Sequence, residues 1–201
     1  FHQVLLYDRD SGRPLSPEVA ATRYPRAVDY LSGYAPLLRK RRIYRVHLER
    51  QPFYACYDIG PYSFARHKLV WKALAAGVRA AVVGAAEGRP VVPDHNVVLV
   101  PFDDPDAAHF LCGVLNSRLC TRFADAYTEW FYSVHLLSHF RAPRYDAGAS
   151  LHREISALSR QAHRATPSDL AALEEILEQR VRELRGFRAW RGVPWREEPR
   201  T

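Results

Sequence analysis

Three short, mainly apolar segments lie between positions 68 and 100, a pattern typical of β-strands. Each segment is rich in β-branched or apolar residues and is bounded by turns containing glycine or proline. Strand-forming residues also flank Gly60 and Pro61, so we expect a curved, mainly antiparallel sheet over residues 52–102. The predicted strands are residues 68–71, 80–83 and 96–100, preceded by the strand-forming residues Phe53, Tyr54, Tyr57, Ile59, Tyr62 and Phe64 and by a separate short strand at 4–7.

Helical spacing of apolar residues precedes this sheet. Ser16 followed by Pro17 predicts a helix start, because serine caps a helix and proline suits its first position. Residues 26–42 then show apolar side chains three and four positions apart. They predict a second helix that bends near Gly33 and Pro36.

Further helices follow the sheet. Asp104 predicts a cap for a helix with one apolar stripe, and Thr166 predicts a cap for the last helix, which ends at Gly186. Helices over 150–164 and 167–185 are close enough in sequence to pack as an antiparallel hairpin. The stripe after Asp104 consists of Phe110, Leu111, Val114, Leu115, Leu119 and Phe123.

Together these elements predict an α+β fold, with a curved antiparallel sheet flanked by helices and followed by a C-terminal helical hairpin. We divide the chain into a connecting strand and basic helix (1–50), a sheet-based core (51–148), the hairpin (149–186) and an irregular tail (187–201). At 201 residues the chain is long enough to bury a sizeable core.

Amino-acid composition indicates the cellular environment in which we expect the protein to fold. No apolar run approaches the roughly 18 residues that would span a membrane. Cys56, Cys112 and Cys120 are odd in number and form no C-x-x-C pair, which favours free thiols in a reducing cytoplasm. The chain contains no methionine and begins at Phe1, so we expect that it was cut from a longer polypeptide.

The formal charge of +7 comes almost entirely from arginine, and the isoelectric point is about 9.5. Arginine suits phosphates and guanine edges, although a GC-rich genome also enriches arginine. The densest basic run spans residues 39–50 and is interleaved with Tyr44 and His47. It predicts either a phosphate-binding patch or a solvated helix end whose cations favour the helix dipole. The predicted phosphate-binding residues are Arg39, Lys40, Arg41, Arg42 and Arg45, with Lys72 as a weaker addition.

A second candidate segment, residues 62–68, leads from a loop into a strand. It carries hydroxyl, guanidinium, imidazole and amine groups, which can reach base edges when a loop presents them. A hydrophilic hairpin explains the same residues equally well. The predicted base-reading residues are Ser63, Arg66, His67 and Lys68.

The sequence offers no catalytic constellation. Pro93 and Asp94 resemble the start of a PD-(D/E)xK nuclease, but no lysine follows Lys72 to complete it. Phosphate loops, dinucleotide fingerprints, nucleophile elbows and H-E-x-x-H motifs are absent. His95, Asn116 and His135 are too loosely spaced for an HNH site. A helix cap explains the carboxylates of Asp103, Asp104 and Asp106 better than a metal site does. We therefore predict neither a catalytic residue nor a metal ligand.

Six groups of short motifs follow one another along the chain in a fixed order. They are LYD, YPRA, YL, LL and Arg41 over residues 6–41; YSF and KLVW over 62–71; PVVPDH at 90–95; AHFLC and LNS over 108–117; SVH and RAPRYD over 133–146; and LHR, LS and His163 over 151–163. In this order they resemble the TaqI-like C-terminal specificity region of N6-adenine DNA methyltransferases and of their fused type IIG restriction-modification relatives. Pro36 departs from the family pattern, in which this helix is uninterrupted.

This resemblance implies a target-recognition domain, with residues 51–148 as its core. Such a domain holds double-stranded DNA, reads its sequence and helps to present an adenine flipped out of the stack. The family's catalytic methyltransferase domain, on the same parent chain, binds S-adenosylmethionine and carries the (N/D)PP(Y/F) motif, which this chain lacks. We therefore expect no cofactor and no methylation by this chain alone. The alternative is a protein-interaction module that docks a partner subunit through the helical hairpin.

Overall fold

The computed structural model describes residues 3–75, 77–127, 131–184 and 188–189. The chain divides into two compact units, Phe1–Phe64 and Ala65–Thr201, and we describe each by itself. This boundary falls 14 residues later than the predicted division after residue 50. The helical hairpin belongs to the same unit as the sheet instead of forming a part of its own.

The first unit is built from short helices around a small core. The helices are α1 (Pro17–Arg23), α2 (Pro25–Ser32) and α3 (Ala35–Lys40), followed by a π-helix, η1 (Tyr44–Leu48), and a 3₁₀ helix, η2 (Pro61–Phe64). Ser16 caps α1 as predicted, with its hydroxyl accepting from the amide of Val19 at 3.3 Å. The core consists of buried Leu6, Ala20 and Tyr54, against which Leu15, Ala27, Val28, Leu31 and Phe53 pack.

Two predictions for the first unit are wrong. Residues 4–7 form only an isolated bridge between Tyr7 and Pro14, and residues 52–66 contain no strand. In residues 52–66, side chains form hydrogen bonds with backbone amides and carbonyls that would otherwise pair with a neighbouring strand. The hydroxyl of Tyr7 accepts from the amide of Cys56 at 2.8 Å and donates to its carbonyl at 3.0 Å. Because these groups are already satisfied, the segment is held as an irregular loop.

The second unit contains the antiparallel sheet, with strand order β2-β1-β3. The strands are β1 (His67–Lys72), β2 (Ala80–Val83) and β3 (Val97–Phe102), close to the predicted segments. Leu69 of β1 pairs with Val82 on one side and Val100 on the other. These three residues belong to the core between the sheet and the helix that follows β3. The fold class is therefore α+β, as predicted.

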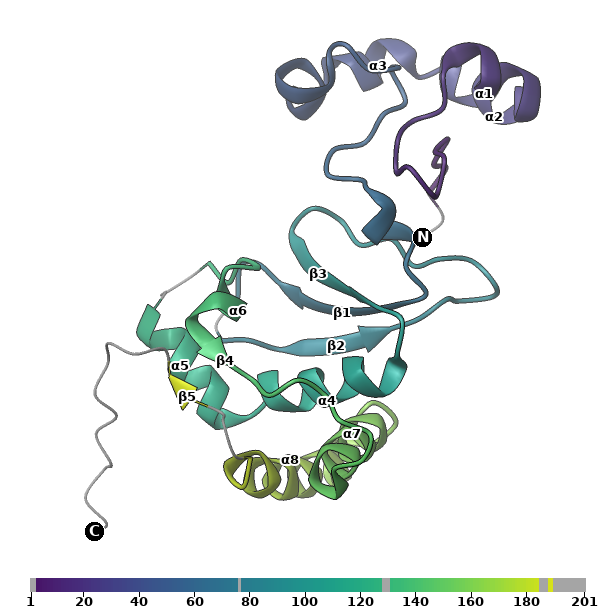
Figure 1. Ribbon diagram of the computed structural model, residues 1–201. Helices are drawn as coiled ribbons and strands as arrows, with labels where there is room; N and C mark the ends of the chain where they lie inside the picture. The colour runs from purple at the N-terminus through teal and green to yellow at the C-terminus, as the bar shows by residue number, and fades with distance from the viewer. Residues whose placement is uncertain (1–2, 76, 128–130, 185–187, 190–201) are drawn as a thin grey trace. The chain divides into compact units, whose positions relative to one another are not determined.

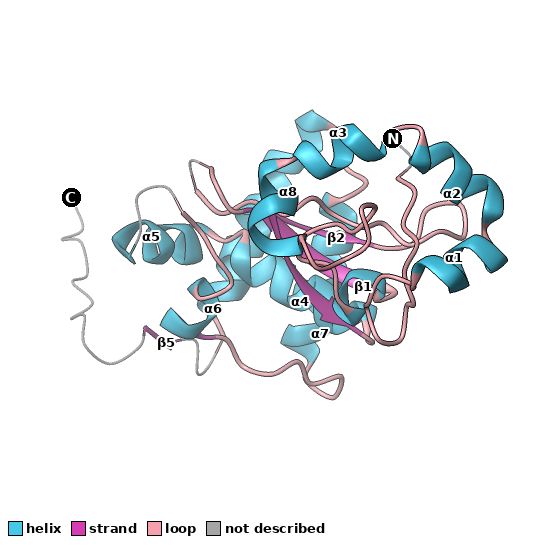
Figure 2. Ribbon diagram, turned by 90° about the horizontal axis from the view of Figure 1, so that it is seen from above, coloured by secondary structure: helices cyan, strands magenta, loops and turns pink. Residues whose placement is uncertain are grey.

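Helices cover one face of this sheet in two layers (Figure 1). The first layer is α4 (Pro105–Leu115), which contacts β1, β2 and β3. The second is the predicted hairpin of α7 (Ser150–Ala162) and α8 (Pro167–Arg182), whose α7 packs along α4. Figure 2 shows the strands together with α4 and α7 from above. α4 shares one core cluster with the hairpin, whose buried residues are Phe110, Val114, Ile155, Leu158, Leu177, Val181 and Leu184.

The predicted single helix after Asp104 is divided in two. α4 stops at Leu115, and α5 (Arg118–Tyr127) begins after two intervening residues. The hydroxyl of Ser117 donates to the carbonyl of Val114 at 2.7 Å and accepts from the amide of Cys120 at 3.1 Å. Ser117 therefore acts as the cap that starts α5.

The remaining elements are short. Helix α6 (Leu136–His139) leads into β4 (Phe140–Arg141), which pairs with β5 (Arg188–Ala189). The predicted irregular tail is thus wrong at residues 188–189, while its other residues and the predicted stop at Gly186 lie outside the described part of the chain. None of the described helices combines the length and apolar character needed to cross a membrane.

Candidate nucleic-acid interface

The basic run of the first unit extends over the end of α3 and the π-helix η1. Arg39 and Lys40 form the last turn of α3, where cations interact favourably with the negative end of the helix dipole. Arg42 lies in the connection, and Arg45 lies in η1. All four side chains are exposed to solvent. Local sequence therefore accounts for their position, and their exposure makes them accessible to a ligand.

These four cations have no acidic partner in the part of the chain that the structure describes. Among the described residues of the first unit, 3–64, no arginine or lysine forms an ion pair with a carboxylate. The guanidinium of Arg39 lies 5.7 Å from the ring centroid of Phe53, which leaves its charge uncompensated. The second unit is different: Arg118 pairs with Glu175 at 2.8 Å and Arg180 pairs with Glu154 at 2.8 Å. The basic run is thus a source of uncompensated positive charge.

Arg41, in the middle of the run, has a structural role. It is partly buried, and its Nε donates to the carbonyl of Leu38 at 2.8 Å. Its Nη2 donates to the carbonyls of Phe53 at 3.2 Å and Ala55 at 3.0 Å. Since these donors are committed to backbone acceptors, we withdraw Arg41 from the predicted phosphate-binding set. It holds the loop at residues 53–55 against the end of α3.

The π-helix presents the next part of the run. π-helices are rare and occur frequently at functional sites. Tyr44 anchors η1 from inside, because its buried hydroxyl donates to the carbonyl of Gln51 at 2.7 Å. Arg45, Val46 and His47 are exposed, and the His47 ring lies 4.9 Å from that of Tyr57. The irregular helix therefore places a cation and a ring pair at the surface.

Two predicted base-reading residues are buried and unavailable to DNA. Ser63 is buried in η2, and its hydroxyl accepts from the amide of Gly60 at 3.3 Å. Lys68 in β1 is fully buried, and its amine donates to the carbonyl of Ala65 at 2.6 Å. Burial lowers the pKa of this amine. Ser63 and Lys68 are therefore removed from the candidate site, since each polar group is buried and hydrogen-bonded within the chain.

The other candidates remain accessible but belong to the second unit. Arg66 is exposed, His67 is half-buried, and Lys72 is exposed at the end of β1. The structure therefore divides the predicted residues, with the basic run in the first unit and these three in the second. Each set is considered by itself.

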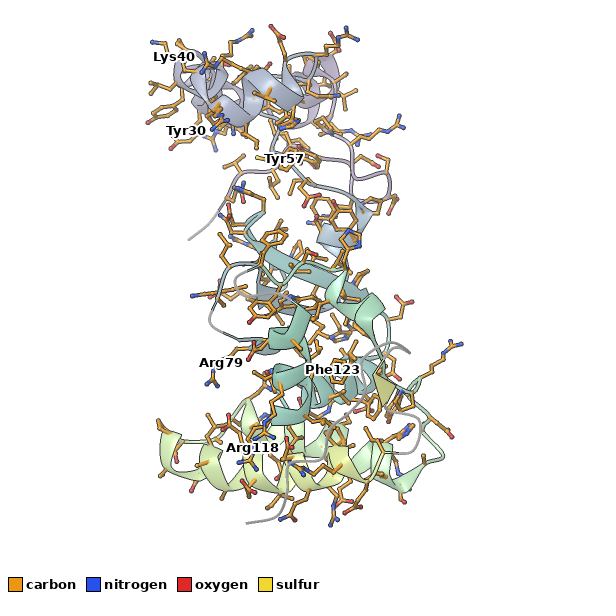
Figure 3. The ribbon with its side chains drawn as sticks, turned by 90° about the vertical axis from the view of Figure 1, so that its left-hand side faces the viewer. Tyr30, Lys40, Tyr57, Arg79, Arg118 and Phe123 are labelled. Atoms are coloured by element: carbon orange, nitrogen blue, oxygen red, sulfur yellow. The ribbon has the colours of Figure 1, made fainter. Side chains whose placement is uncertain are left out.

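Two exposed tyrosines were missed by the sequence prediction. Tyr30 near the end of α2 and Tyr34 before α3 have ring centroids 5.3 Å apart and an interplanar angle of 59°. The interaction with Tyr34 raises the pKa of Tyr30. Figure 3 shows Tyr30 and Lys40 among the side chains that the helices of the first unit direct outward. In the sequence, the spacing of four residues between Tyr30 and Tyr34, just before the basic run, could have indicated this pair.

Several residues of the resemblance motifs have a structural role in the second unit. Strand β2 is an edge strand, and Asn116 saturates its outer edge at Ala80 by accepting from the amide and donating to the carbonyl, both at 2.8 Å. His163 accepts from the amide of Val82 through Nε2 at 2.8 Å. These side chains block the addition of another strand at this edge.

The aspartates around Pro105 also have a structural role. Asp104 caps α4 by accepting from the amide of Asp106 at 2.8 Å, as predicted. Asp106 pairs with Arg160 of α7, and hydrogen bonds from this guanidinium lower the pKa of the carboxyl. Among the residues that the structure describes, no three histidines, cysteines or carboxylates lie in a group that could hold a metal ion.

Comparison of the chain with protein-family models found no matching family, and comparison with curated proteins found no match.

Proposed function

We propose that this chain is the DNA-recognition region of an adenine-N6 DNA methyltransferase or of a fused restriction-modification enzyme. Its partners are double-stranded DNA and the catalytic domain of the parent chain, which binds S-adenosylmethionine. The chain itself binds no cofactor and catalyses no reaction. The parent enzyme acts in the cytoplasm, where its DNA substrate lies and where Cys56, Cys112 and Cys120 stay as free thiols.

One observation carries the proposal: exposed cations without acidic partners lie together on α3 and η1. These are Arg39, Lys40, Arg42 and Arg45. Each phosphate that such a residue neutralises releases condensed counterions, which lowers the slope of log K against log salt by about 0.9. Four contacts therefore supply a substantial affinity that does not depend on sequence. Base reading falls to Arg66 and His67, the two accessible members of the predicted set.

The protein-docking alternative is less well supported. It requires an apolar stripe on the hairpin that a partner can reach. Leu177, Val181 and Leu184 of that stripe are buried against α4, in a cluster with Phe110 and Ile155. The hairpin thus uses its apolar face within its own unit. The resemblance motifs and the uncompensated basic run both favour DNA as the partner.

The first experiment is fluorescence anisotropy of the chain with a labelled 20-base-pair duplex from low to physiological salt. We expect affinity to fall steeply as salt rises. The double variant Arg42→Gln/Arg45→Gln should reduce the salt slope by about one for each arginine. Arg118→Gln is the matched control, because Glu175 already compensates that charge. It should leave the slope unchanged.

Two outcomes would contradict the proposal. Absence of duplex binding at low salt, both by this chain and by the full-length parent, would exclude a DNA-recognition role. If the affinity of the double variant had the same salt dependence as that of the wild type, the basic residues of α3 and η1 would not be part of the DNA interface. Binding to a protein partner with little salt dependence would support the docking alternative instead.

A further inference from the structure

An exposed aromatic and apolar stripe lies beside the basic run on α2 and α3. It consists of Tyr30, Tyr34 and Leu37, which are 61%, 47% and 64% exposed. Tyr30 lies in α2 and Tyr34 lies immediately before α3, with their ring centroids 5.3 Å apart, and Leu37 follows Tyr34 by three residues in α3. The inward positions of the same helices are different residues, including Val28 and Leu31, which pack against the core of the first unit. The stripe is therefore no part of that core.

Phosphate contacts alone do not account for these side chains. A basic helix that only neutralises phosphates needs no exposed rings, and large apolar surfaces in water commonly mark interaction sites. Lys40 follows Leu37 by three residues, at the end of the same helix. Its amine and the guanidinium of Arg42 have no acidic partner among the described residues. Rings and uncompensated cations are thus displayed by one short segment.

We propose that the stripe is a stacking site for unpaired nucleobases of DNA, with the neighbouring cations holding the backbone. The inference rests on the proposed function and deepens it by naming single-stranded DNA as a second form of its substrate. An unpaired base exposes a flat π-face that a tyrosine ring can cover, and such stacking combined with a cationic groove is the usual basis of single-strand binding. A paired and stacked base offers no such face.

The charge around the stripe favours a nucleic acid over a protein partner. The segment from Tyr34 to His47 carries five arginine and lysine side chains and no aspartate or glutamate. Within the described part of the chain, Arg41 alone among these five is engaged with backbone carbonyls. A partner must therefore bring negative charge together with flat apolar surface, and unpaired DNA offers both along its whole length.

The test compares binding of the intact chain to a labelled 20-nucleotide oligothymidylate and to a 20-base-pair duplex. The variant Tyr30→Leu/Tyr34→Leu keeps apolar area but removes both rings. We expect it to weaken oligothymidylate binding by about tenfold or more, and to change duplex binding by less than about twofold. Tyr30→Phe/Tyr34→Phe keeps the rings and should bind like the wild type. Tyr24→Leu, at an exposed tyrosine outside the stripe, is the matched control.

The outcomes separate this inference from the proposed function. If the wild type binds duplex but not oligothymidylate, or if the leucine variant weakens neither probe, the stacking site is excluded and the duplex-binding role stands. Equal weakening of both probes also excludes it, because it points to a general loss of the basic surface. If neither this chain nor the full-length parent binds either probe at low salt, both proposals fail. The far-UV circular dichroism spectrum of each variant establishes that it folds.

Discussion

Arg41 and Arg42 are adjacent in the sequence and carry the same side chain, yet their roles in the structure differ. Arg41 donates to three backbone carbonyls and fixes the loop at residues 53–55. Arg42 is exposed and has no acidic partner among the described residues. The difference arises because only Arg41 faces the chain that returns after η1. Composition therefore predicts the charge of the run, while the tertiary contacts select the residues that can bind a ligand.

His109 gives a prediction at the same scale. Its ring is buried, with Nδ1 3.2 Å from the hydroxyl of Ser159, and it packs edge-on against His163 at 4.9 Å. Burial, with smaller effects from His163 and Arg160, lowers the pKa of His109 to about 4, against about 6.5 in the unfolded chain. The unfolded chain therefore binds a proton that the folded chain excludes. We expect the free energy of unfolding to fall as the pH drops from about 6.5 to about 4.

Urea unfolding at a series of pH values between 7.5 and 4 measures this effect. The variant His109→Gln has no titrating ring, so its stability should fall less over this range than that of the wild type. His163 and Asp106, which also lie near this ring, are present in both proteins. Parallel curves for His109→Gln and the wild type would exclude His109 as the cause.

At the scale of elements, β2 depends on side chains from two helices. Its inner edge pairs with β1, whereas its outer edge is saturated by Asn116 at the end of α4 and His163 at the end of α7. Cys112 adds a weak hydrogen bond to the carbonyl of Ala80 at 3.4 Å. The sheet and the two helical layers are thus joined by directional bonds as well as by apolar packing.

Replacing Asn116 with alanine removes both hydrogen bonds to Ala80, which leaves the amide without a partner and the carbonyl with only the weak hydrogen bond from Cys112. Each unsatisfied buried group costs about 1–3 kcal/mol, so we expect the free energy of unfolding to fall by about 2–4 kcal/mol. Denaturant unfolding followed by tryptophan fluorescence measures the loss. Asn96→Ala removes an exposed amide bonded to Asp94, and should change stability by less than about 0.5 kcal/mol. Equal effects of the two substitutions would show that Asn116 does not stabilise the edge.

At the scale of the whole molecule, the two units have cores of very different size. The first unit relies on three buried residues and their partly buried neighbours, whereas the second contains two larger clusters. Because hydrophobic stabilisation grows with the apolar area buried, we expect the first unit to unfold at a lower denaturant concentration. All four tryptophans follow residue 64 in the sequence, and Trp71 of β1 is buried in the core of the second unit.

This distribution gives a direct test. Far-UV circular dichroism reports helices of both units, so its signal should begin to change before tryptophan fluorescence does. Tyr54→Leu, which removes a 2.6 Å hydrogen bond from the core of the first unit to the carbonyl of Leu15, should destabilise that unit by about 1–2 kcal/mol. It should leave the midpoint measured by tryptophan fluorescence unchanged. A single transition, shifted equally for both probes, would show that the two units unfold together.

Local signals in the sequence determined most of the element boundaries. Ser16 and Asp104 mark helix starts because a cap acts through bonds to amides two or three residues away. The segments 68–71 and 80–83 are strands because their apolar residues fit a half-buried sheet. The antiparallel pairing and the helical hairpin followed from short connections. The sequence also determined that the residues around Arg42 carry a strong positive charge.

The tertiary structure alone decided which polar groups are free. Ser63 and Lys68 have the chemistry of base-reading residues, but tertiary packing buries both side chains. Their hydrogen-bond partners, Gly60 and Ala65, lie three residues before each of them. Residues 52–66 have strand-forming side chains, but Tyr7 and the basic run, distant in sequence, bind their backbone groups. Tyr30 is exposed because its helix turns other residues to the core. Burial and hydrogen-bond satisfaction depend on contacts between distant segments, so no local pattern predicts them.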